Sequence, residues 1–350
     1  MNIKQKLRIV AGLIILSILI LSGASILSWQ LNHRLNNFKR LFPPHIVHVS
    51  DVSDLKFNGY TIAGISSNTV YLANIRNPLY ILIYTISRKD TQNVKIRLPE
   101  KQVLFAGRLI VDSPFFYLSD QIKHSIFSGK IPSLQANKTI SAQAFFVDLV
   151  PISNSSLVIR TISPQTKTYT LAKESIRQSA IQWGNGLLEK QSDGLFELDG
   201  ILNYDKTTGS LIYVYHYKNK FICMDTLLHL IYKGKTIDTV EHAHITAAYL
   251  PAENAYYLAS PPRIVNKKSY ASNNQLFVLS ALKANNENSR DFSNASVIDV
   301  YNLRNGIYKY SFYLYNYKGS HLNYFEVYEN TLVAIFDHYL LTYKLNPSYY

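Results

Sequence analysis

The segment Gly194–Asn219 reads GLFELDGILNYDKTTGSLIYVYHYKN, and it carries the strongest fold signal in the chain. Ile201–Tyr204 and Leu211–Tyr217 are apolar and aromatic runs of strand length, and the polar link Asp205–Gly209 separates them. The glycine that closes the link suits a tight turn, because it adopts backbone angles that other residues avoid. The segment therefore predicts a β-hairpin.

A second segment, near the C-terminus, repeats this design. The strand-like runs Ser296–Asn302 and Ile307–Leu314 are joined by Leu303–Gly306, whose Asn-Gly pair is favoured in hairpin turns with positive φ. In both segments an aspartate or asparagine ends one strand, a short turn closes with glycine, and an aromatic-rich strand follows. In general form, both resemble the outer hairpin of a β-propeller blade.

The rest of the body indicates an all-β chain. From Ser53 onward, short apolar or alternating runs of roughly 4 to 8 residues are broken by Asn, Gly, Ser and Asp. The chain holds 27 Tyr and 16 Phe, and we interpret the tyrosines as filler of half-buried sheets rather than as a dedicated aromatic site. The clearest exception is Leu171–Trp183, whose period predicts a few turns of helix.

A leucine that follows a turn residue or polar pair recurs before strand-like runs. Spacings of 30, 48, 54, 65 and 56 residues separate its six copies: Leu79, Leu109, Leu157, Leu211, Leu276 and Leu332. A propeller blade of four strands takes about 40 to 50 residues. The repeat therefore predicts an all-β fold, a β-propeller of six or seven blades. Chance recurrence in a large sandwich or barrel is the alternative.

The N-terminal region is continuously apolar. Ile9–Trp29 contains no charged residue and follows Lys4, Lys6 and Arg8. A helix of this length spans roughly 30 Å, the thickness of the hydrocarbon core of a bilayer. Ser22–Ser25 is compatible with the cleavage site of a signal peptide, but apolarity resumes beyond it, which favours an uncleaved anchor.

These features predict four regions: a basic leader at 1–8, a transmembrane signal anchor at 9–29, a stalk at 30–50 and a propeller-like domain at 51–350. The stalk continues the helix until Pro43 and Pro44 end it. Three cations on each side of the anchor leave the orientation undecided by charge. An N-terminal anchor with a short basic leader usually exports the rest of its chain. We therefore expect a single-pass membrane protein with an extracytoplasmic body, periplasmic in a Gram-negative cell.

The formal net charge of +13 is concentrated at the N-terminus. Residues 1–40 hold six of the 36 Lys and Arg and none of the 23 Asp and Glu, which leaves 30 against 23, or about +7, for the body. The cations of the body are dispersed without a run of three. Binding through phosphate neutralisation needs a clustered basic face. The charges therefore favour a solvated, mildly basic surface, and we expect no nucleic-acid partner.

Metal and nucleophile patterns are weak. Glu241–His244, with the sequence EHAH, is the best metal candidate, because alternate residues on a strand face the same side. Two imidazoles do not make a site, so a structural role is the better interpretation. Cys223 lies in an apolar run that favours an inert buried thiol, and a single cysteine excludes a disulfide scaffold.

Other polar residues are isolated beside strands. The remaining histidines in or beside apolar strands are His216, His229, His321 and His338. The aspartates that follow or interrupt strand-like runs are Asp148, Asp199, Asp225 and Asp337. Such carboxylates accept backbone hydrogen bonds at turns or point into a propeller channel, and turns are the favoured interpretation. We predict no catalytic, cofactor-binding or metal-binding residue and no cofactor.

The segment Gly194–Asn219 also resembles uncharacterised membrane-anchored propeller-like proteins of Bacteroidetes-type bacteria. The resemblance covers about half of the body and brings no catalytic residue with it. We expect a membrane-anchored extracytoplasmic binding or scaffolding module, attached to the membrane by its N-terminal helix and partnered by a membrane or envelope protein. The alternatives are a propeller enzyme of lyase, hydrolase or dehydrogenase type, or a small-ligand sensor, with its site at the central channel.

Overall fold

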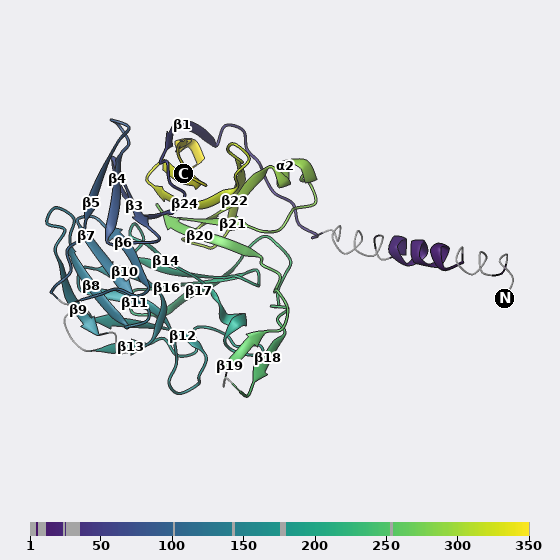
Figure 1. Ribbon diagram of the computed structural model, residues 1–350, viewed down its shortest axis with the longest axis horizontal. Helices are drawn as coiled ribbons and strands as arrows, with labels where there is room; N and C mark the ends of the chain where they lie inside the picture. The colour runs from purple at the N-terminus through teal and green to yellow at the C-terminus, as the bar shows by residue number, and fades with distance from the viewer. Residues whose placement is uncertain are drawn as a thin grey trace.

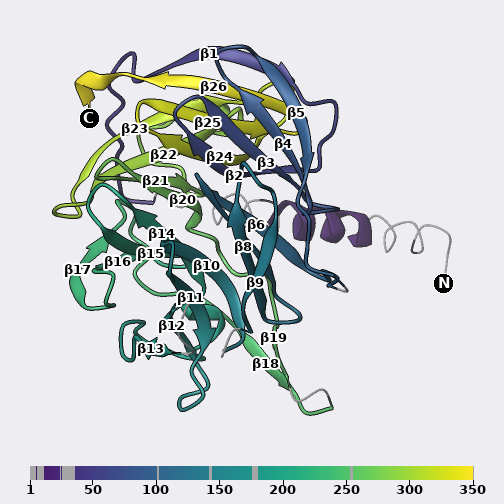
Figure 2. The ribbon, with the colours of Figure 1, turned by 90° about the vertical axis from the view of Figure 1, so that its left-hand side faces the viewer.

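The described chain forms six four-stranded antiparallel sheets arranged around a central axis (Figures 1 and 2). The structure, a computed structural model, describes residues 5, 12–23, 25, 36–100, 102–141, 144–175, 180–252 and 255–349. Figure 2 looks along the axis, with β2, β6, β10, β14, β20 and β24 nearest the centre. This arrangement is a six-bladed β-propeller, which confirms the predicted all-β fold and selects six blades over seven.

Each blade runs from an inner strand at the axis to an outer strand at the rim. Blade 1 is β2 (Tyr60–Ser66), β3 (Thr69–Asn74), β4 (Tyr80–Thr85) and β5 (Asp90–Lys95). Blade 2 is β6 (Gly107–Asp112), β7 (Phe115–Asp120), β8 (Ser125–Lys130) and β9 (Ala136–Ser141). Blade 3 is β10 (Phe146–Ser153), β11 (Ser156–Ile162), β12 (Tyr169–Ser175) and β13 (Ile181–Trp183).

The other three blades follow the same order. Blade 4 is β14 (Gly200–Asp205), β15 (Ser210–Tyr215), β16 (Lys220–Met224) and β17 (Leu230–Lys235). Blade 5 is β20 (Asn266–Ser272), β21 (Gln275–Ser280), β22 (Ala295–Asn302) and β23 (Tyr308–Tyr315). Blade 6 is β24 (Leu322–Tyr328), β25 (Thr331–Phe336), β26 (Tyr339–Leu345) and β1 (Val47–Asp54). The short helices are η1 (Phe196–Leu198), α2 (Ser289–Ser293) and η2 (Pro347–Tyr349).

Blade 6 closes the ring by combining both ends of the chain. Its three inner strands come from the C-terminal region, and β1 supplies the outer strand by pairing antiparallel with β26, from Val47 opposite Leu345 to Asp54 opposite Tyr339. Figure 2 shows β1 beside the C-terminal strands. Without β1, strand β26 would be the open edge of this blade. The pairing of β1 with β26 joins two segments that are almost 300 residues apart along the chain.

The recurring leucine marks the second strand of the blades. Leu157, Leu211, Leu276 and Leu332 are each the second residue of the second strand in blades 3 to 6, and each is fully buried. In blades 1 and 2 this position belongs to Val70 and Phe116, also fully buried. Leu79 and Leu109, which continued the sequence repeat, occupy other positions. The repeat therefore gave the correct blade number, with the wrong residues in blades 1 and 2.

Six of the hydrophobic clusters among the described residues lie one between each pair of adjacent blades. The middle strands are buried on both faces, as β15 and β21 illustrate, because each blade is covered by a neighbour on either side. The largest fully buried side chains include four tyrosines from four blades: Tyr84, Tyr117, Tyr213 and Tyr301. Each hydroxyl is hydrogen-bonded, for example Tyr213 Oη to the Leu198 carbonyl at 2.6 Å. These tyrosines fill sheets, as the composition predicted.

Two local predictions differ from the structure. Leu171–Trp183 was expected to be helical, but its described residues lie in β12 and β13 of blade 3, where burial between neighbouring blades outweighs the helical period. The two hairpins predicted from the sequence both form, but they occupy different positions in their blades. Ser296–Leu314 forms the outer hairpin of blade 5, as predicted, whereas Ile201–Tyr217 forms the inner hairpin of blade 4.

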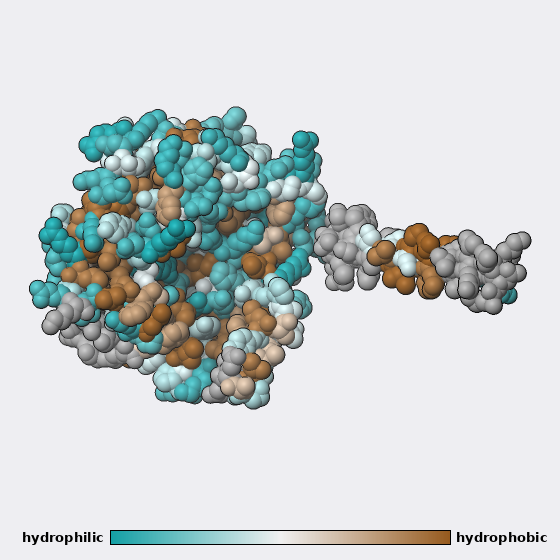
Figure 3. All heavy atoms as spheres, viewed as in Figure 1, coloured by the Kyte–Doolittle hydropathy of each residue, from teal (hydrophilic) through white to brown (hydrophobic). Residues whose placement is uncertain are grey.

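The structure describes residues 12–23 and 25 of the predicted anchor, Ile9–Trp29, and the other residues of that segment lie outside the described part of the chain. Residues 12–23 are helical, and in Figure 3 their hydrophobic side chains stand clear of the propeller. Among the described residues, no helix combines the length and apolarity needed to cross a membrane. The anchor at 9–29 and the leader at 1–8 therefore remain predictions.

The segment predicted as a stalk is attached to the propeller wherever it is described. Residues 36–46 are not helical. Residues 36–42 lie against blade 5, and residues 44–46 contact Asn346 and Tyr349 near the C-terminus before β1 begins at Val47. Phe38 packs in a small apolar cluster with Val240, Val265, Leu282 and Ala284. Hydrogen bonds join Asn285 N to the Phe38 carbonyl at 2.9 Å and Ser311 N to the Leu41 carbonyl at 2.8 Å.

Arg40 carries most of this attachment. Its guanidinium is fully buried and forms two hydrogen bonds to Asp299, from Nε at 2.7 Å and Nη2 at 3.0 Å, and an ion pair with Glu287. It also donates to the Leu282 carbonyl at 2.9 Å. Burial lowers the pKa of Arg40, but the carboxylates of Asp299 and Glu287 outweigh it and hold the pKa above its ordinary value. We call Arg40, Glu287 and Asp299 the Arg40 cluster.

Candidate functional site

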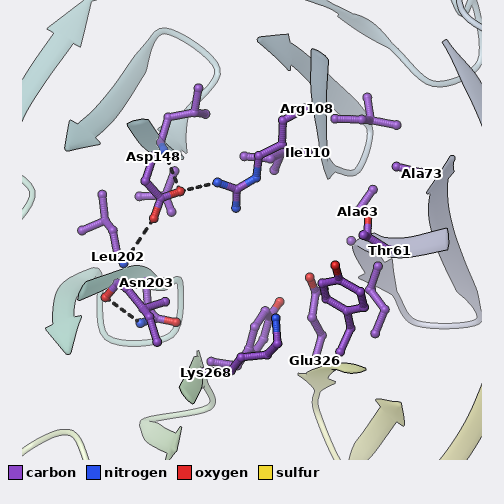
Figure 4. Close-up of a pocket in the computed structure, with 18 of the residues that line it drawn as sticks. Thr61, Ala63, Ala73, Arg108, Ile110, Asp148, Leu202, Asn203, Lys268 and Glu326 are labelled. Carbon is purple, nitrogen blue, oxygen red and sulfur yellow. Dashed lines mark hydrogen bonds and ion pairs between the residues drawn. The ribbon is translucent and has the colours of Figure 1, made fainter. Parts of the chain in front are cut away.

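The six inner strands enclose a cavity of about 700 Å³ along the propeller axis. Every inner strand contributes lining residues, and Figure 4 shows how their side chains converge. Each blade has an even number of strands, so all six inner strands start at the same end of the channel. Residues near these starts therefore gather at one mouth, although they are far apart in sequence.

Four charged or ionisable side chains line the channel, and we call them the channel cluster: Arg108, Asp148 and Lys268 near this mouth, and Glu326 farther along its strand. They come from β6, β10, β20 and β24, which belong to four different blades. A volume of this size with a few convergent polar groups is typical of a small-molecule site. The channel cluster is therefore the candidate functional site.

Asp148 links three consecutive blades. Its carboxylate forms an ion pair with Arg108 of blade 2 and accepts hydrogen bonds from Leu149 N at 2.9 Å and from Leu202 N of blade 4 at 3.5 Å. The Asp148 side chain is 13% exposed, whereas the Arg108 side chain is 50% exposed. Asp148 is therefore the more buried partner of the ion pair, and the half-exposed Arg108 guanidinium keeps N–H donors free for a molecule in the channel.

Lys268 approaches the same space from blade 5. Its ammonium lies over the ring of Tyr324, 4.3 Å from the centroid, and no described carboxylate lies within ion-pair distance of it. Burial lowers the pKa of Lys268, and the neighbouring charge of Arg108 lowers it further. Two cations thus face one cavity, and only Arg108 has a carboxylate partner, Asp148, among the described residues.

Glu326 completes the channel cluster from blade 6. Its side chain reaches the channel, yet its Oε2 atom is buried without a hydrogen-bond partner. Burial raises the pKa of Glu326 to about 8, although nearby Arg108 and a hydrogen bond with Tyr270 act in the opposite direction. The carboxyl group is therefore largely protonated at neutral pH and can donate a hydrogen bond.

A second ion pair supports the same mouth. Arg160 of β11 lines the channel and pairs with Asp199, which also accepts from Gly200 N at 2.9 Å. The Nε atom of Arg160 is buried without a hydrogen-bond partner. Two buried, unpartnered polar atoms, Arg160 Nε and Glu326 Oε2, thus belong to channel-lining residues. Unpartnered buried polar atoms are rare in folded proteins and call for an explanation.

The residues singled out from the sequence divide between the channel and the surface. Asp148 and His216 line the channel, Asp199 holds Arg160 there, and the His216 ring contacts the Asn266 carbonyl at 2.8 Å. Asp225 accepts backbone hydrogen bonds in a turn, as favoured from the sequence. Three side chains of the channel cluster, Arg108, Lys268 and Glu326, were not identified from the sequence.

The remaining surface candidates do not converge. His229 contacts Asp225 at 2.9 Å, His338 contacts Asp337 at 2.7 Å, and His321 is exposed. His242 and His244 lie exposed in a loop rather than on a strand. In the part of the chain that the structure describes, no three His, Cys, Asp or Glu side chains are placed to hold a metal ion.

Cys223 lies on β16 and is almost fully buried. Burial raises the pKa of its thiol. Both observations agree with the interpretation of an inert thiol, because nucleophilic cysteines need an accessible and stabilised thiolate.

A two-stranded hairpin is inserted between blades 4 and 5, formed by β18 (Ala247–Leu250) and β19 (Ala255–Leu258). This insertion accounts for the longest leucine spacing, between Leu211 and Leu276. The hairpin exposes a group of large apolar and aromatic side chains: Tyr249, Leu250, Tyr256, Tyr257 and Leu258. Tyr249 and Tyr256 are paired across the strands, with ring centroids 5.0 Å apart. We call this element the tyrosine hairpin.

Comparisons with solved structures agree on the fold. A member of the DUF4221 family from Bacteroides vulgatus superposes with a TM-score of 0.51 at 12% sequence identity, covering 89% of this chain and 99% of that protein. A catalytically inactive virginiamycin B lyase from Staphylococcus aureus, solved with quinupristin, gives a TM-score of 0.47 at 10% identity, covering 86% and 100%. No profile of a known protein family and no curated protein sequence matches the chain. At 12% identity, the likeness to the Bacteroides vulgatus protein shows the propeller fold alone.

Proposed function

We propose that this chain is a membrane-anchored, extracytoplasmic binding module that takes a small ligand into the channel of its propeller. One observation carries the ligand site: charged or ionisable side chains from four blades converge on a cavity of about 700 Å³. Placing charged groups in a partly buried channel costs free energy, and a bound ligand that pairs with them would offset this cost. The structural likeness to the Bacteroides vulgatus protein supports an origin among Bacteroidetes-type propeller proteins as part of the same proposal.

Native mass spectrometry tests the ligand site. The full-length chain is extracted from the membranes of cells that express it, in an uncharged detergent, and sprayed without denaturation. We expect the measured mass to exceed that of the chain alone by the mass of a bound ligand, and we expect this excess to disappear when the chain is unfolded. Ser269→Trp is the test variant, because Ser269 lines the channel and a tryptophan there occupies the cavity.

Ser87→Trp is the matched control, because Ser87 lies exposed in the turn between β4 and β5. The channel variant should lose the mass excess and the control should retain it. An excess that survives in Ser269→Trp places the ligand outside the channel and contradicts the proposal. An absence of any excess from the native chain, together with no binding in solution, also contradicts it.

The anchor is tested separately by extraction and protease protection. We expect the full chain to stay in the membrane pellet under alkaline carbonate, and its body to be digested when protease is added outside the cytoplasmic membrane. Chain released by carbonate contradicts the anchor. Protection of the body until the membrane is broken contradicts the extracytoplasmic location.

A second candidate function, docking of a membrane or envelope protein, rests on the tyrosine hairpin. Exposed aromatic groups of this kind are enriched where proteins meet. Cys223 is buried, so a cysteine introduced at Tyr256 is the only reactive thiol expected on the folded body. We expect Tyr256→Cys to cross-link to another envelope protein, and the same reagent on Ser87→Cys to give none. Equal cross-linking from both positions contradicts docking at the hairpin.

Catalysis in the channel is the alternative that one observation favours. Glu326 has a pKa raised to about 8 by burial, and such groups often act as acids or bases near neutral pH. Incubation of the isolated chain with its co-purified ligand separates the two functions. Unchanged ligand supports binding, and a converted product supports an enzyme.

A further inference from the structure

We infer that the ligand of the channel is a small dianion, a dicarboxylate or a phosphate ester, held between Arg108 and Lys268. This inference rests on the proposed binding function and narrows its ligand class. It depends on a charge balance among the described residues that line the channel. Those residues carry five cationic side chains and three carboxyl groups: Arg108, Arg160, Lys206, Lys267 and Lys268, and Asp112, Asp148 and Glu326.

Three of the cations are neutralised by neighbours. Arg108 pairs with Asp148, Arg160 with Asp199, and Lys206 with Asp112 at the far end of the inner strands. Glu326 hydrogen-bonds Tyr270 and forms no ion pair with a described residue, and burial raises its pKa to about 8, so it does not serve as a counter-ion at neutral pH. Lys267 and Lys268 have no carboxylate within ion-pair distance among the described residues. The channel therefore carries an excess of two positive charges, which a dianion would neutralise.

The geometry offers donors as well as charge. The Arg108 guanidinium is half exposed toward the cavity, Lys268 presents an ammonium across from it, and a protonated Glu326 supplies a third donor (Figure 4). Guanidinium and ammonium groups together are the usual recognition set for carboxylate and phosphate oxygens.

Calorimetric titration with a charge series tests this inference. Succinate, butanediol and diaminobutane share a four-carbon chain and differ in charge, and glycerol phosphate distinguishes a phosphate ester from a dicarboxylate. The full-length chain in an uncharged detergent is titrated with each. We expect binding of succinate or glycerol phosphate, with no heat from the diol or the diamine.

Channel variants then locate the site. Lys268→Met should weaken the bound anion about tenfold or more, because a charge-assisted hydrogen bond is lost, and Arg108→Gln should weaken it similarly. Lys268→Arg should retain most of the affinity. Lys190→Met is the matched control, since Lys190 is exposed outside the channel, and it should bind as the native chain does. Thermal unfolding of each variant verifies that it is folded.

The outcomes separate this inference from the proposed function. Binding of the diamine or the diol in preference to the dianion overturns the inference and leaves a channel-binding module in place. Anion binding that Lys268→Met and Arg108→Gln leave unchanged also overturns it. Absence of binding by all four compounds at millimolar concentration overturns the inference, while a co-purified molecule lost in Ser269→Trp would still support the function.

Discussion

The Arg40 cluster and the channel cluster are both built from basic and carboxylate side chains, but they differ in how far these side chains are exposed and paired. In the Arg40 cluster, the arginine and both carboxylates are at most 3% exposed, and they are further bound by Ser311, Tyr313 and the backbone of Ala284. In the channel cluster, Arg108 is half exposed, Lys268 has no described carboxylate partner, and an oxygen of Glu326 is unpartnered.

This difference separates a structural role from a binding role. In a fully satisfied network of buried charges, no donor or acceptor is free to bind a ligand. Removing one member leaves the other charges buried without a partner in a medium of low polarity. Open networks contribute little to folding, because water already solvates part of each charge. We therefore expect changes in the Arg40 cluster to alter stability and changes in the channel cluster to alter binding.

The largest effect is expected from Arg40→Ala. Asp299 and Glu287 would remain buried without their cation, so the free energy of unfolding should fall by about 3–5 kcal/mol. Urea denaturation followed by circular dichroism measures the change. Arg88→Ala is the control, because Arg88 pairs with Asp90 at the exposed surface, and it should cost less than about 1 kcal/mol. A loss for Arg40→Ala no larger than for the control would remove the distinction between the two clusters.

The next effect is a pH dependence contributed by Glu326. Its pKa is about 8 in the folded chain, where it faces Tyr270 and Arg108, against an ordinary value of 4.5. Between these values the folded state binds more protons than the unfolded state. The stabilisation is therefore complete below about pH 4.5 and declines as the pH rises to about 8, with a slope of at most about 1.4 kcal/mol per pH unit.

Glu326→Gln tests this dependence, because glutamine keeps the shape and loses the proton. Unfolding curves at several pH values should show a flatter profile for the variant than for the native chain. Glu100→Gln is the control, since Glu100 is exposed, and it should follow the native profile. If the stability of the native chain and that of Glu326→Gln change in parallel with pH, the Glu326 carboxyl group does not titrate between about pH 4.5 and pH 8.

A smaller effect on stability is expected from Lys268→Met. Burial lowers the pKa of this lysine, so replacing the ammonium removes a desolvated charge. The free energy of unfolding should stay within about 1 kcal/mol of the native value, or rise slightly. The same urea assay measures it. A loss approaching that of Arg40→Ala would make Lys268 a structural residue and weaken the binding role of the channel cluster.

The smallest effect is the coupling between Arg108 and Asp148. A double-mutant cycle with Arg108→Gln and Asp148→Asn should give a coupling energy of about 0.2–1 kcal/mol, as for other half-exposed ion pairs. Addition of the anion should change this coupling, because the ligand competes with Asp148 for the guanidinium. A coupling of several kcal/mol would place this pair with the Arg40 cluster.

The sequence predicts the fold more fully than the site. Strand-length runs and the recurring leucine predict a propeller of six or seven blades, because the second strand of a blade is buried on both faces and its apolar character recurs along the chain. The repeat fails in blades 1 and 2, where Val70 and Phe116 fill the same buried position. Burial constrains size and polarity there, and it does not require leucine.

The site is harder to predict because its parts are far apart in sequence. Arg108 and Lys268 resemble any other cation on a strand until the inner strands meet around one axis. Asp148 and Asp199 stand out in the sequence as strand-end carboxylates, and only the fold places them beside channel cations. Arg40 is misleading for the same reason: beside an apolar run it resembles a membrane-flanking charge, whereas its partners lie some 250 residues away.

The route of the N-terminal segment has a mechanical consequence. Asn36–Leu41 is fastened to blade 5 before β1 reaches the rim of blade 6. A force that pulls on the N-terminus therefore loads the contacts of Asn36–Leu41, including the Arg40 cluster, before the pairing of β1 with β26 bears tension. The segment therefore shields the β1–β26 pairing, which closes the ring, from a load applied at the N-terminus.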